Sequence, residues 1–294
     1  MVKTRKEAVI VGAGAIGTRT AGLLTRAGAS VRVIDRDFID DRNLERQKLY
    51  NKNDVGKAKA LVVAERLGIE GVVDDVNANS IGRLLGKPDV VLDCTDNMAA
   101  RFLLNDYCLA NGVLWVYAGA VQDRGIVMAF SPEGKPCLRC LIPREPGPLE
   151  TCDTVGIDNE TASRVAALQT EHALKGSNGG TLIDISHEEI TKTDVPPRKN
   201  CPACAQKKYE YLERTETIVA LCAKDAYHMR LNKRLDLPSL DKTLSGKFKT
   251  KLFDGVLHVW PDARRISLFA SGRAIVEAKD EKEARSRLAR FVGV

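Results

Sequence analysis

The sequence has no apolar run that approaches the roughly 20 residues of a membrane-spanning helix. Hydrophobic residues make up 44% and charged residues 29% of the 294 residues, which is typical of globular proteins in aqueous solution. The first residues are basic, but the apolar stretch and cleavage site of a secretory signal do not follow them. These absences exclude membrane insertion and predict a cytoplasmic protein.

A block of one charge sign is also missing. The net charge of +6 comes from lysines and arginines that are spread along the chain. Nucleic-acid-binding domains usually gather such residues in one basic patch, so nucleic acid is not favoured as a partner. Dispersed basic residues also suit a protein partner with an acidic surface. The four histidines show no metal-ligand spacing, and we assign them no chemistry.

Strand-like and helix-like stretches alternate through the first two thirds of the chain. Residues 8–34 have the pattern strand, glycine turn, helix, strand, and the alternation continues beyond them. It predicts an α/β fold, with a Rossmann-like, mostly parallel sheet and flanking helices, over residues 1–212. After residue 212 the pattern changes, and it predicts a small α+β module over residues 213–294 that ends in an amphipathic helix.

Three glycines, Gly12, Gly14 and Gly17, form a GxGxxG pattern between the first predicted strand and helix. Backbone amides at the start of such a helix can meet phosphate oxygens, because glycine has no Cβ atom in the way. Ala15 belongs to the same turn. The pattern predicts a nucleotide site, and the alternative is a tight turn that binds no ligand.

Two acidic residues follow the second predicted strand. Asp35 and Asp37 lie at about the distance from the glycines where an acid bonds a ribose hydroxyl in Rossmann folds. The ordinary interpretation of this pattern is NAD and hydride transfer, but three later features argue against it.

The first feature is the stretch DRNLERQ, in which Asn43 and Arg46 add an amide and a guanidinium close to the nucleotide. A triphosphate needs this extra positive charge more than NAD does. The second is Lys59, which could neutralise phosphate charge, although a solvated helix lysine is the simpler interpretation. The third is Asp96 beside Asn97, where a parallel strand ends and ligands gather. Asp96 could hold Mg²⁺ or cap the next helix.

Four cysteines form two CxxC pairs, Cys137 with Cys140 and Cys201 with Cys204. Their thiolates could complete a tetrahedral structural zinc site, and redox-active dithiols are the main alternative. Cys152 lies in the irregular loop predicted between residues 132 and 158. It could attack an activated acyl group, or it could be a spare thiol. The remaining cysteines lie in apolar surroundings and are interpreted as core residues: Cys94, Cys108 and Cys222.

Taken together, the chain resembles the ThiF/MoeB/HesA family and the adenylation half of ubiquitin-activating enzymes. The resemblance covers residues 8–204 and rests on GAGAIG, DRDFIDDRNLERQ, VGKAKA, VLDCTDNMAAR, CLRC and CPAC. It implies binding of ATP and Mg²⁺, attack of a protein's C-terminal carboxylate on the α-phosphate, and release of pyrophosphate. It further implies that Asp37 binds the ribose, that Asn43, Arg46 and Lys59 bind phosphates, and that Asp96 binds magnesium.

The implied substrate is a ubiquitin-like modifier with a C-terminal diglycine, and thioester formation on Cys152 would follow its adenylation. Activation of a sulfur carrier for thiamine, molybdopterin or tRNA thiolation is the alternative. An NAD-dependent oxidoreductase or an inactive partner subunit would be a different class of protein. The resemblance also implies a homodimer and a downstream conjugating enzyme or sulfur donor, although only Lys3 and Arg5 stand where relatives carry an N-terminal arginine-bearing arm.

Overall fold

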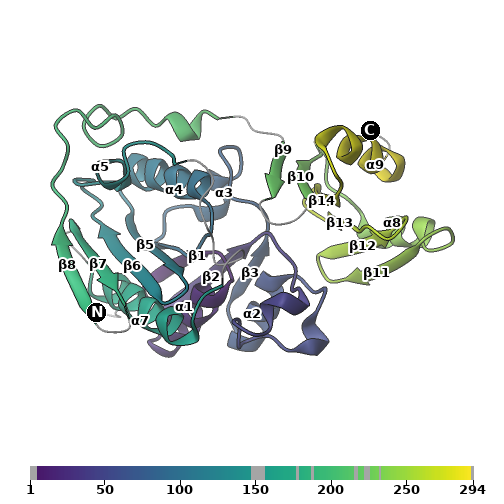
Figure 1. Cartoon of the computed structure of the whole chain (residues 1–294), viewed down its shortest axis with the longest axis horizontal. Coiled ribbons are helices and arrows are strands. Elements are labelled where there is room, and N and C mark those ends of the chain that lie inside the picture. The colour runs from purple at the N-terminus through teal and green to yellow at the C-terminus, as the bar shows by residue number, and fades with distance from the viewer. Residues whose placement is uncertain are drawn as a thin grey trace.

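An eight-stranded sheet forms the centre of the larger part of the molecule (Figure 1). The computed structural model describes residues 5–146, 156–176, 179–186, 189–214, 218–221, 226–231 and 233–292. The strand order is β3-β2-β1-β4-β5-β6-β7-β8, in which the first five strands are parallel and the last three join antiparallel. The predicted mostly parallel sheet is therefore confirmed. Its strands are β1 (Glu7–Val11), β2 (Ser30–Asp35), β3 (Glu70–Val73), β4 (Val90–Asp93), β5 (Leu114–Val121), β6 (Arg124–Phe130), β7 (Thr181–Ile185) and β8 (Ile190–Asp194).

Helices cover both faces of this sheet. Along β1, Ala8 and Ile10 belong to a core cluster with α1, α2 and α7, whereas Val9 and Val11 belong to a cluster with α3 and α4. Successive strand side chains point to opposite faces, so a strand buried on both sides is apolar throughout. The helices are α1 (Ala15–Arg26), α2 (Lys59–Leu67), α3 (Ile81–Leu85), α4 (Met98–Asn111), α5 (Leu138–Leu141) and α7 (Asn159–Lys175).

Helix α7 is joined to the sheet by one buried glutamine. Gln169 Nε2 donates to the carbonyl oxygens of Asp93 (2.9 Å) and Val116 (3.0 Å), at the ends of β4 and within β5. Its Oε1 accepts from the hydroxyl of Thr20 (3.0 Å) on α1 and from the thiol of Cys94 (3.2 Å). Buried polar groups in folded proteins are almost always hydrogen-bonded. These four bonds fix α7 against two strands and a helix.

The second sheet belongs to the C-terminal part of the chain, which lies beside β3 and α2 in Figure 1. Its strands are antiparallel in the order β11-β12-β13-β14-β10-β9, and α8 and α9 pack with it around a separate core. The predicted α+β character is therefore confirmed. The elements are β9 (Ile218–Leu221), β10 (Ala226–Arg230), α8 (Leu237–Leu244), β11 (Lys249–Phe253), β12 (Val256–Trp260), β13 (Ile266–Phe269), β14 (Arg273–Glu277) and α9 (Glu281–Val292).

The sequence pattern predicts a helix over residues 54–67, but α2 begins only at Lys59. Asp54 instead ends a 3₁₀ turn (Lys52–Asp54), where its carboxylate accepts from the Asn51 amide (2.9 Å) and pairs with Arg66 (2.5 Å). The chain then pairs with residues 37–39 through the bonds Ile39 N to Lys57 O (2.8 Å) and Gly56 N to Ile39 O (2.8 Å). Only after this pairing does the helix begin.

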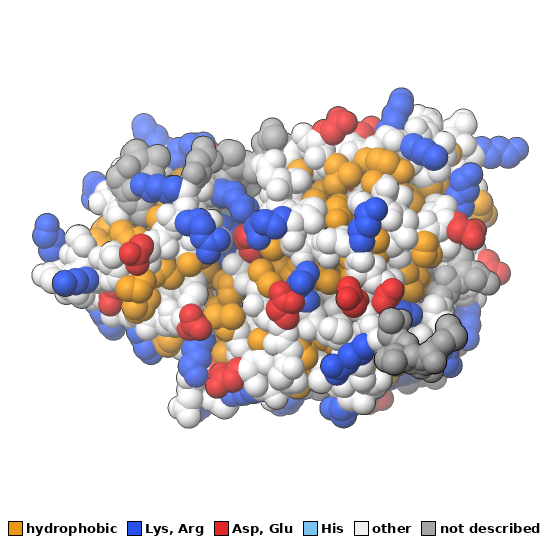
Figure 2. Space-filling view, turned by 180° about the vertical axis from the view of Figure 1, so that it is seen from behind, with side chains coloured by type: hydrophobic (Ala, Val, Ile, Leu, Met, Phe, Trp, Pro, Cys, Tyr) orange, Lys and Arg blue, Asp and Glu red, His pale blue; other side chains and the backbone are white. Residues whose placement is uncertain are grey.

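The outer surface matches the charge pattern of the sequence. On the face opposite that of Figure 1, lysine and arginine side chains are spread over the whole surface with acidic side chains between them (Figure 2). Among the helices that the structure describes, none has both the length and the apolar character needed to cross a membrane.

Candidate functional site

The glycine turn lies between β1 and α1. Close packing of the backbone explains two of its glycines. Gly12 has φ +102°, and a Cβ atom there would lie 2.4 Å from the carbonyl oxygen of Cys94. A Cβ atom on Gly17 would lie 1.9 Å from the carbonyl oxygen of Gly12. These two positions exclude a side chain because helix and strands approach each other closely.

Gly14 differs from its neighbours, because a Cβ atom there would meet nothing within 4 Å. Its backbone, with φ −83°, is one that any residue adopts. Gly14 is also the N-cap of α1, which has no side-chain cap and no acidic residue in its first turn. The first amides of a helix carry partial positive charge and need acceptors. The turn therefore leaves an open, positively polarised helix end where β1 ends, and an anion fits there.

The two predicted acids after β2 have different surroundings. Both carboxylate oxygens of Asp35 accept backbone amides, from Ala13 (2.6 Å) and from Asp37 (2.6 Å). Burial raises the pKa of Asp35, and Lys59 offsets part of that effect. Asp35 therefore holds the glycine turn against the chain that follows β2, whereas the carbonyl of Asp37 accepts the amide of Lys59 (3.0 Å).

The predicted phosphate residues Asn43 and Arg46 lie on a loop between β2 and α2. Asn43 is buried in a 3₁₀ turn (Asp41–Asn43), where its Oδ1 accepts the Asp40 amide (2.9 Å). Arg19 on α1 donates through Nη1 to the carbonyls of Ala15 (2.6 Å) and Arg46 (3.3 Å), so Arg46 lies next to the open helix end. Arg19 was missed in the sequence, because nothing there distinguishes it from an ordinary arginine on a helix.

Lys59 is the first residue of α2 and is 7% exposed, so its interpretation as a solvated helix lysine is wrong. Asp96 is exposed in the loop after β4, and the cap of α4 is Asn97, whose Oδ1 accepts the Ala100 amide (2.8 Å). The helix-cap interpretation of Asp96 is therefore wrong as well.

Arg36 was missed in the sequence, although it stands between the two predicted acids. Its guanidinium pairs with Asp75 (3.2 Å), which follows β3. Burial alone would lower the pKa of Arg36, but Asp75, Asp37 and Asp96 raise it. A fixed cation therefore lies among the carboxylates that follow β2, β3 and β4, and it balances their charge.

A cleft of about 400 Å³ adjoins this site. Arg42, Glu45 and Arg46 line one side, and residues 156–159 at the start of α7 line the other. Residues 147–155, which include the predicted acyl acceptor Cys152, lie outside the part of the chain that the structure describes. Cys108 is buried and Cys94 is partly buried against the core, and burial raises the pKa of both thiols, in agreement with their interpretation as core residues. Cys222 lies outside the described residues.

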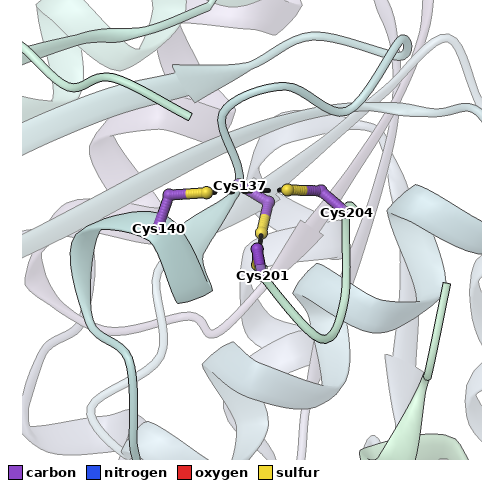
Figure 3. A group of neighbouring side chains, drawn as sticks. All are labelled: Cys137, Cys140, Cys201 and Cys204. Carbon is purple, nitrogen blue, oxygen red and sulfur yellow. Dashed lines mark hydrogen bonds between the residues drawn. The ribbon is translucent and has the colours of Figure 1, made fainter. Parts of the chain in front are cut away.

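The two CxxC pairs come together in one cluster, although 64 residues separate their members (Figure 3). The four sulfur atoms lie within 4.8 Å of one another and point towards a common centre. Cys137 and Cys201 are 3.6 Å apart, and Cys140 and Cys204 are 3.5 Å apart. Tetrahedral zinc with ~2.3 Å bonds requires sulfur atoms about 3.8 Å apart. The cluster could therefore bind zinc.

Comparison with known proteins agrees with this geometry. The ThiF family model matches residues 4–212. The sulfur carrier protein ThiS adenylyltransferase of Bacillus subtilis is 31% identical over 310 aligned residues, which cover 97% of this chain and 92% of that protein. The sulfur carrier protein adenylyltransferase of Thermus thermophilus is 31% identical and covers 69% and 83%. The SAMP-activating enzyme E1 of Haloferax volcanii is 30% identical and covers 70% and 82%.

A solved structure shares the fold of about two thirds of this chain. The crystal structure of Escherichia coli MccB with AMPCPP and MccA superimposes with a TM-score of 0.59 at 21% sequence identity. It covers 69% of this chain and 67% of that one. At this identity the likeness concerns the fold.

Proposed function

This chain belongs to the ThiF family, and from that premise we propose that it uses ATP to adenylate the C-terminal glycine carboxylate of a sulfur-carrier protein with a ubiquitin fold. The carboxylate would attack the α-phosphorus of ATP, so that an acyl-adenylate forms and pyrophosphate leaves. The predicted family and enzyme class, an adenylyltransferase, are confirmed by the match over residues 4–212 and by relatives that carry this name.

The observation that carries the proposal is the open position at Gly14. Packing explains why Gly12 and Gly17 have no side chain, but nothing in the described chain occupies the space beside Gly14. A missing side chain next to an uncapped helix end is what a phosphate group requires for close approach. This supports a nucleotide at the turn.

The surrounding charges suit a triphosphate that must accept an anionic nucleophile. Asn43, Arg46 and Lys59 would bind phosphates. Asn43 would also hold the loop that carries Arg46, and Asp37 would bind the ribose. The exposed carboxylate of Asp96 would hold Mg²⁺, which supplies further neutralisation of phosphate charge. Because a carboxylate and a triphosphate repel each other, these fixed cations lower the cost of their approach.

Zinc is proposed as a structural ion. The four cysteines are buried, and the Arg198 amide donates to Cys140 Sγ (3.3 Å), as backbone amides do around zinc-bound thiolates. The cluster connects the α5 segment to the chain after β8, and it stands apart from the glycine turn in the fold.

The sulfur-carrier alternative is preferred to the generic ubiquitin-like modifier. The relative that aligns along nearly the whole chain is named for the sulfur carrier ThiS, and the Thermus relative is also named for a sulfur carrier. A diglycine-ended carrier, a homodimer and a separate sulfur donor are the partners that follow from this choice. A cytoplasmic location stays a prediction.

The direct test is ATP–pyrophosphate exchange with purified protein, Mg²⁺ and a diglycine-ended sulfur carrier. We expect exchange that requires the carrier, and its loss in Asp96→Ala. The matched control is Glu133→Ala, which removes an exposed carboxylate where β6 ends, beside the start of β5 and away from the strand ends that carry the site. Exchange without the carrier, or unchanged exchange in Asp96→Ala, would disprove the proposed function.

A second candidate is activation of a modifier that becomes conjugated to proteins, which the SAMP-activating relative favours. It predicts a thioester on Cys152 after adenylation. A non-reducing gel of enzyme, ATP and substrate tests it, because a thiol-sensitive adduct should disappear in Cys152→Ala. An adduct that persists in this variant would exclude Cys152 as the acceptor.

A further inference from the structure

The C-terminal module packs against the base of the loop that carries the proposed phosphate residues. The base consists of residues 37–39 and 56–59, which pair with each other and include both Asp37 and Lys59. Phe38 of this base is buried in an apolar cluster with Val256, Phe269 and Ile275 of the module. The module thus covers a part of the larger domain that carries two proposed nucleotide ligands.

A buried histidine of the module fixes the second segment of the base, residues 56–59. His258 Nε2 bonds to the carbonyl of Gly56 (2.8 Å), and Nδ1 bonds to the hydroxyl of Ser267 (2.9 Å). Since a carbonyl only accepts, Nε2 carries the proton and Nδ1 accepts from the serine. Gly56 lies so close to the module that a Cβ atom there would be 2.7 Å from the ring of Phe253.

Two arginines of the module reach residues on either side of Phe38. Arg265 lies over the Phe38 ring, with Cζ 4.2 Å from its centroid, and is 3.8 Å from the carboxylate of Asp40. Asp40 in turn donates its amide to the side chain of Asn43. Arg273 is fully buried, and its Nη2 donates to the carbonyl oxygen of Arg36.

Arg273 belongs to a buried group of charges around Arg36. The carboxylate of Asp75 lies near both arginines, and Asp37 interacts electrostatically with both as well. Burial would raise the pKa of Asp75, but the arginines Arg36 and Arg273 contribute to lowering it to about 2, so Asp75 remains charged. Arg273 Nε and Nη1 have no hydrogen-bond partner among the described residues, so its buried charge is compensated through the Arg36 carbonyl and the nearby carboxylates. The position of Arg273 is therefore coupled to residues 36 and 37.

We infer that the C-terminal module contributes to nucleotide binding. Arg273 is a positioning residue that holds the backbone of Arg36 and thereby the carboxylate of Asp37. The inference rests on the proposed function. It assigns the module, which lies beyond the residues that the family model matches, a role in ATP affinity. Without Arg273, the Arg36 carbonyl loses its donor and Asp75 loses a cation, so the loop base is held less firmly.

The test is calorimetric titration of the full chain with ATP and Mg²⁺. Arg273→Met is expected to raise the Kd for ATP about tenfold, which corresponds to ~1.4 kcal/mol, and Arg273→Lys should recover part of the loss. The matched control is Arg287→Met, which removes an arginine of similar burial from the same module. Arg287 pairs with Asp262 (2.6 Å) on the module itself, so its loss should lower the melting temperature without changing the Kd.

Arg265→Met keeps the inference testable if Arg273→Met fails to fold, because Arg265 lies at the edge of the contact. It should raise the Kd by a smaller factor. Equal Kd values for the wild type and the folded Arg273 or Arg265 variants would overturn the inference and leave the proposed function intact, as would equal losses in Arg273→Met and Arg287→Met. A wild type that does not bind ATP would overturn the proposed function and this inference with it.

Discussion

Substitution of alanine for each of two glycines of the turn separates the needs of the fold from those of the ligand. Alanine at Gly17 would place its Cβ atom 1.9 Å from the carbonyl oxygen of Gly12, so backbone atoms of α1 or β1 must move. Overpacking usually costs ~1–3 kcal/mol, and a clash between backbone atoms belongs at the upper end. A loss of ~3 kcal/mol lowers the melting temperature of a domain of this size by roughly 6–12 °C.

Alanine at Gly14 should have the opposite effect. Its Cβ atom meets nothing within 4 Å, so the free energy of unfolding should change by no more than ~0.5 kcal/mol. The methyl group would, however, stand between the helix amides and a phosphate. A hydrogen bond to a charged group contributes ~1.5–3 kcal/mol, so the Kd for ATP should rise about ten- to a hundredfold.

Denaturant unfolding and calorimetric ATP titration measure the two effects on the same samples. Gly82→Ala on α3 is the control, because its Cβ atom would also meet nothing within 4 Å and α3 packs on the opposite face of the sheet from α1. It should leave the Kd unchanged. Unchanged ATP affinity in Gly14→Ala would refute a phosphate at this helix end, and wild-type stability in Gly17→Ala would refute the close approach of α1 to the turn.

Three further predictions concern other parts of the molecule. Purified protein should contain one zinc ion per chain by elemental analysis, and Cys201→Ser should lose the ion and unfold at a lower denaturant concentration. Burial and Arg273 lower the pKa of His228 to about 3, and burial lowers that of His258 to about 4. Both are therefore neutral in the folded state, and their stabilisation is complete above pH 6.5 and declines as the pH falls towards 4 and 3. When the pH is lowered from 7 to 5, the free energy of unfolding should fall by about 2 kcal/mol for each histidine. Denaturant titration at both pH values measures this loss. Gln169→Leu leaves two buried carbonyl groups without their donor, and it should cost ~2–4 kcal/mol in the same assay.

The features that could be predicted from the sequence are those with a short-range physical signal. The apolar run before Gly12 and the glycine spacing predict β1, the turn and α1, because a strand buried on both faces needs continuous apolar residues. The strand-like pattern of residues 181–185 also predicts β7, with the bounds that the structure shows. The two CxxC pairs were also predicted to meet, since zinc chemistry requires four thiolates whatever their separation in the chain.

Several strands were missed because their side chains contradict the usual pattern. All five residues of β8 are exposed, so no apolar alternation marks it. Strands β10 and β14 contain His228 and Arg273, which are polar in sequence but buried in the structure. Their burial depends on partners from the other domain, and no local pattern reveals such partners. Charged residues are rarely buried unless they are paired, so the sequence alone gives no reason to place these residues in the core.

The two acids after β2 show why a motif does not by itself assign a role. By their distance from the glycines alone, Asp35 and Asp37 are equivalent candidates for the ribose, and only the family resemblance implies Asp37. In the structure, both oxygens of Asp35 accept backbone amides, and one of these amides belongs to Asp37 itself. The carboxylate of Asp35 thus orients Asp37, two residues further along the chain, and Arg273 holds the same segment through the Arg36 carbonyl. In the proposed site Asp37 would bind the ribose, and its position would depend on Asp35 and Arg273, which would not touch the nucleotide.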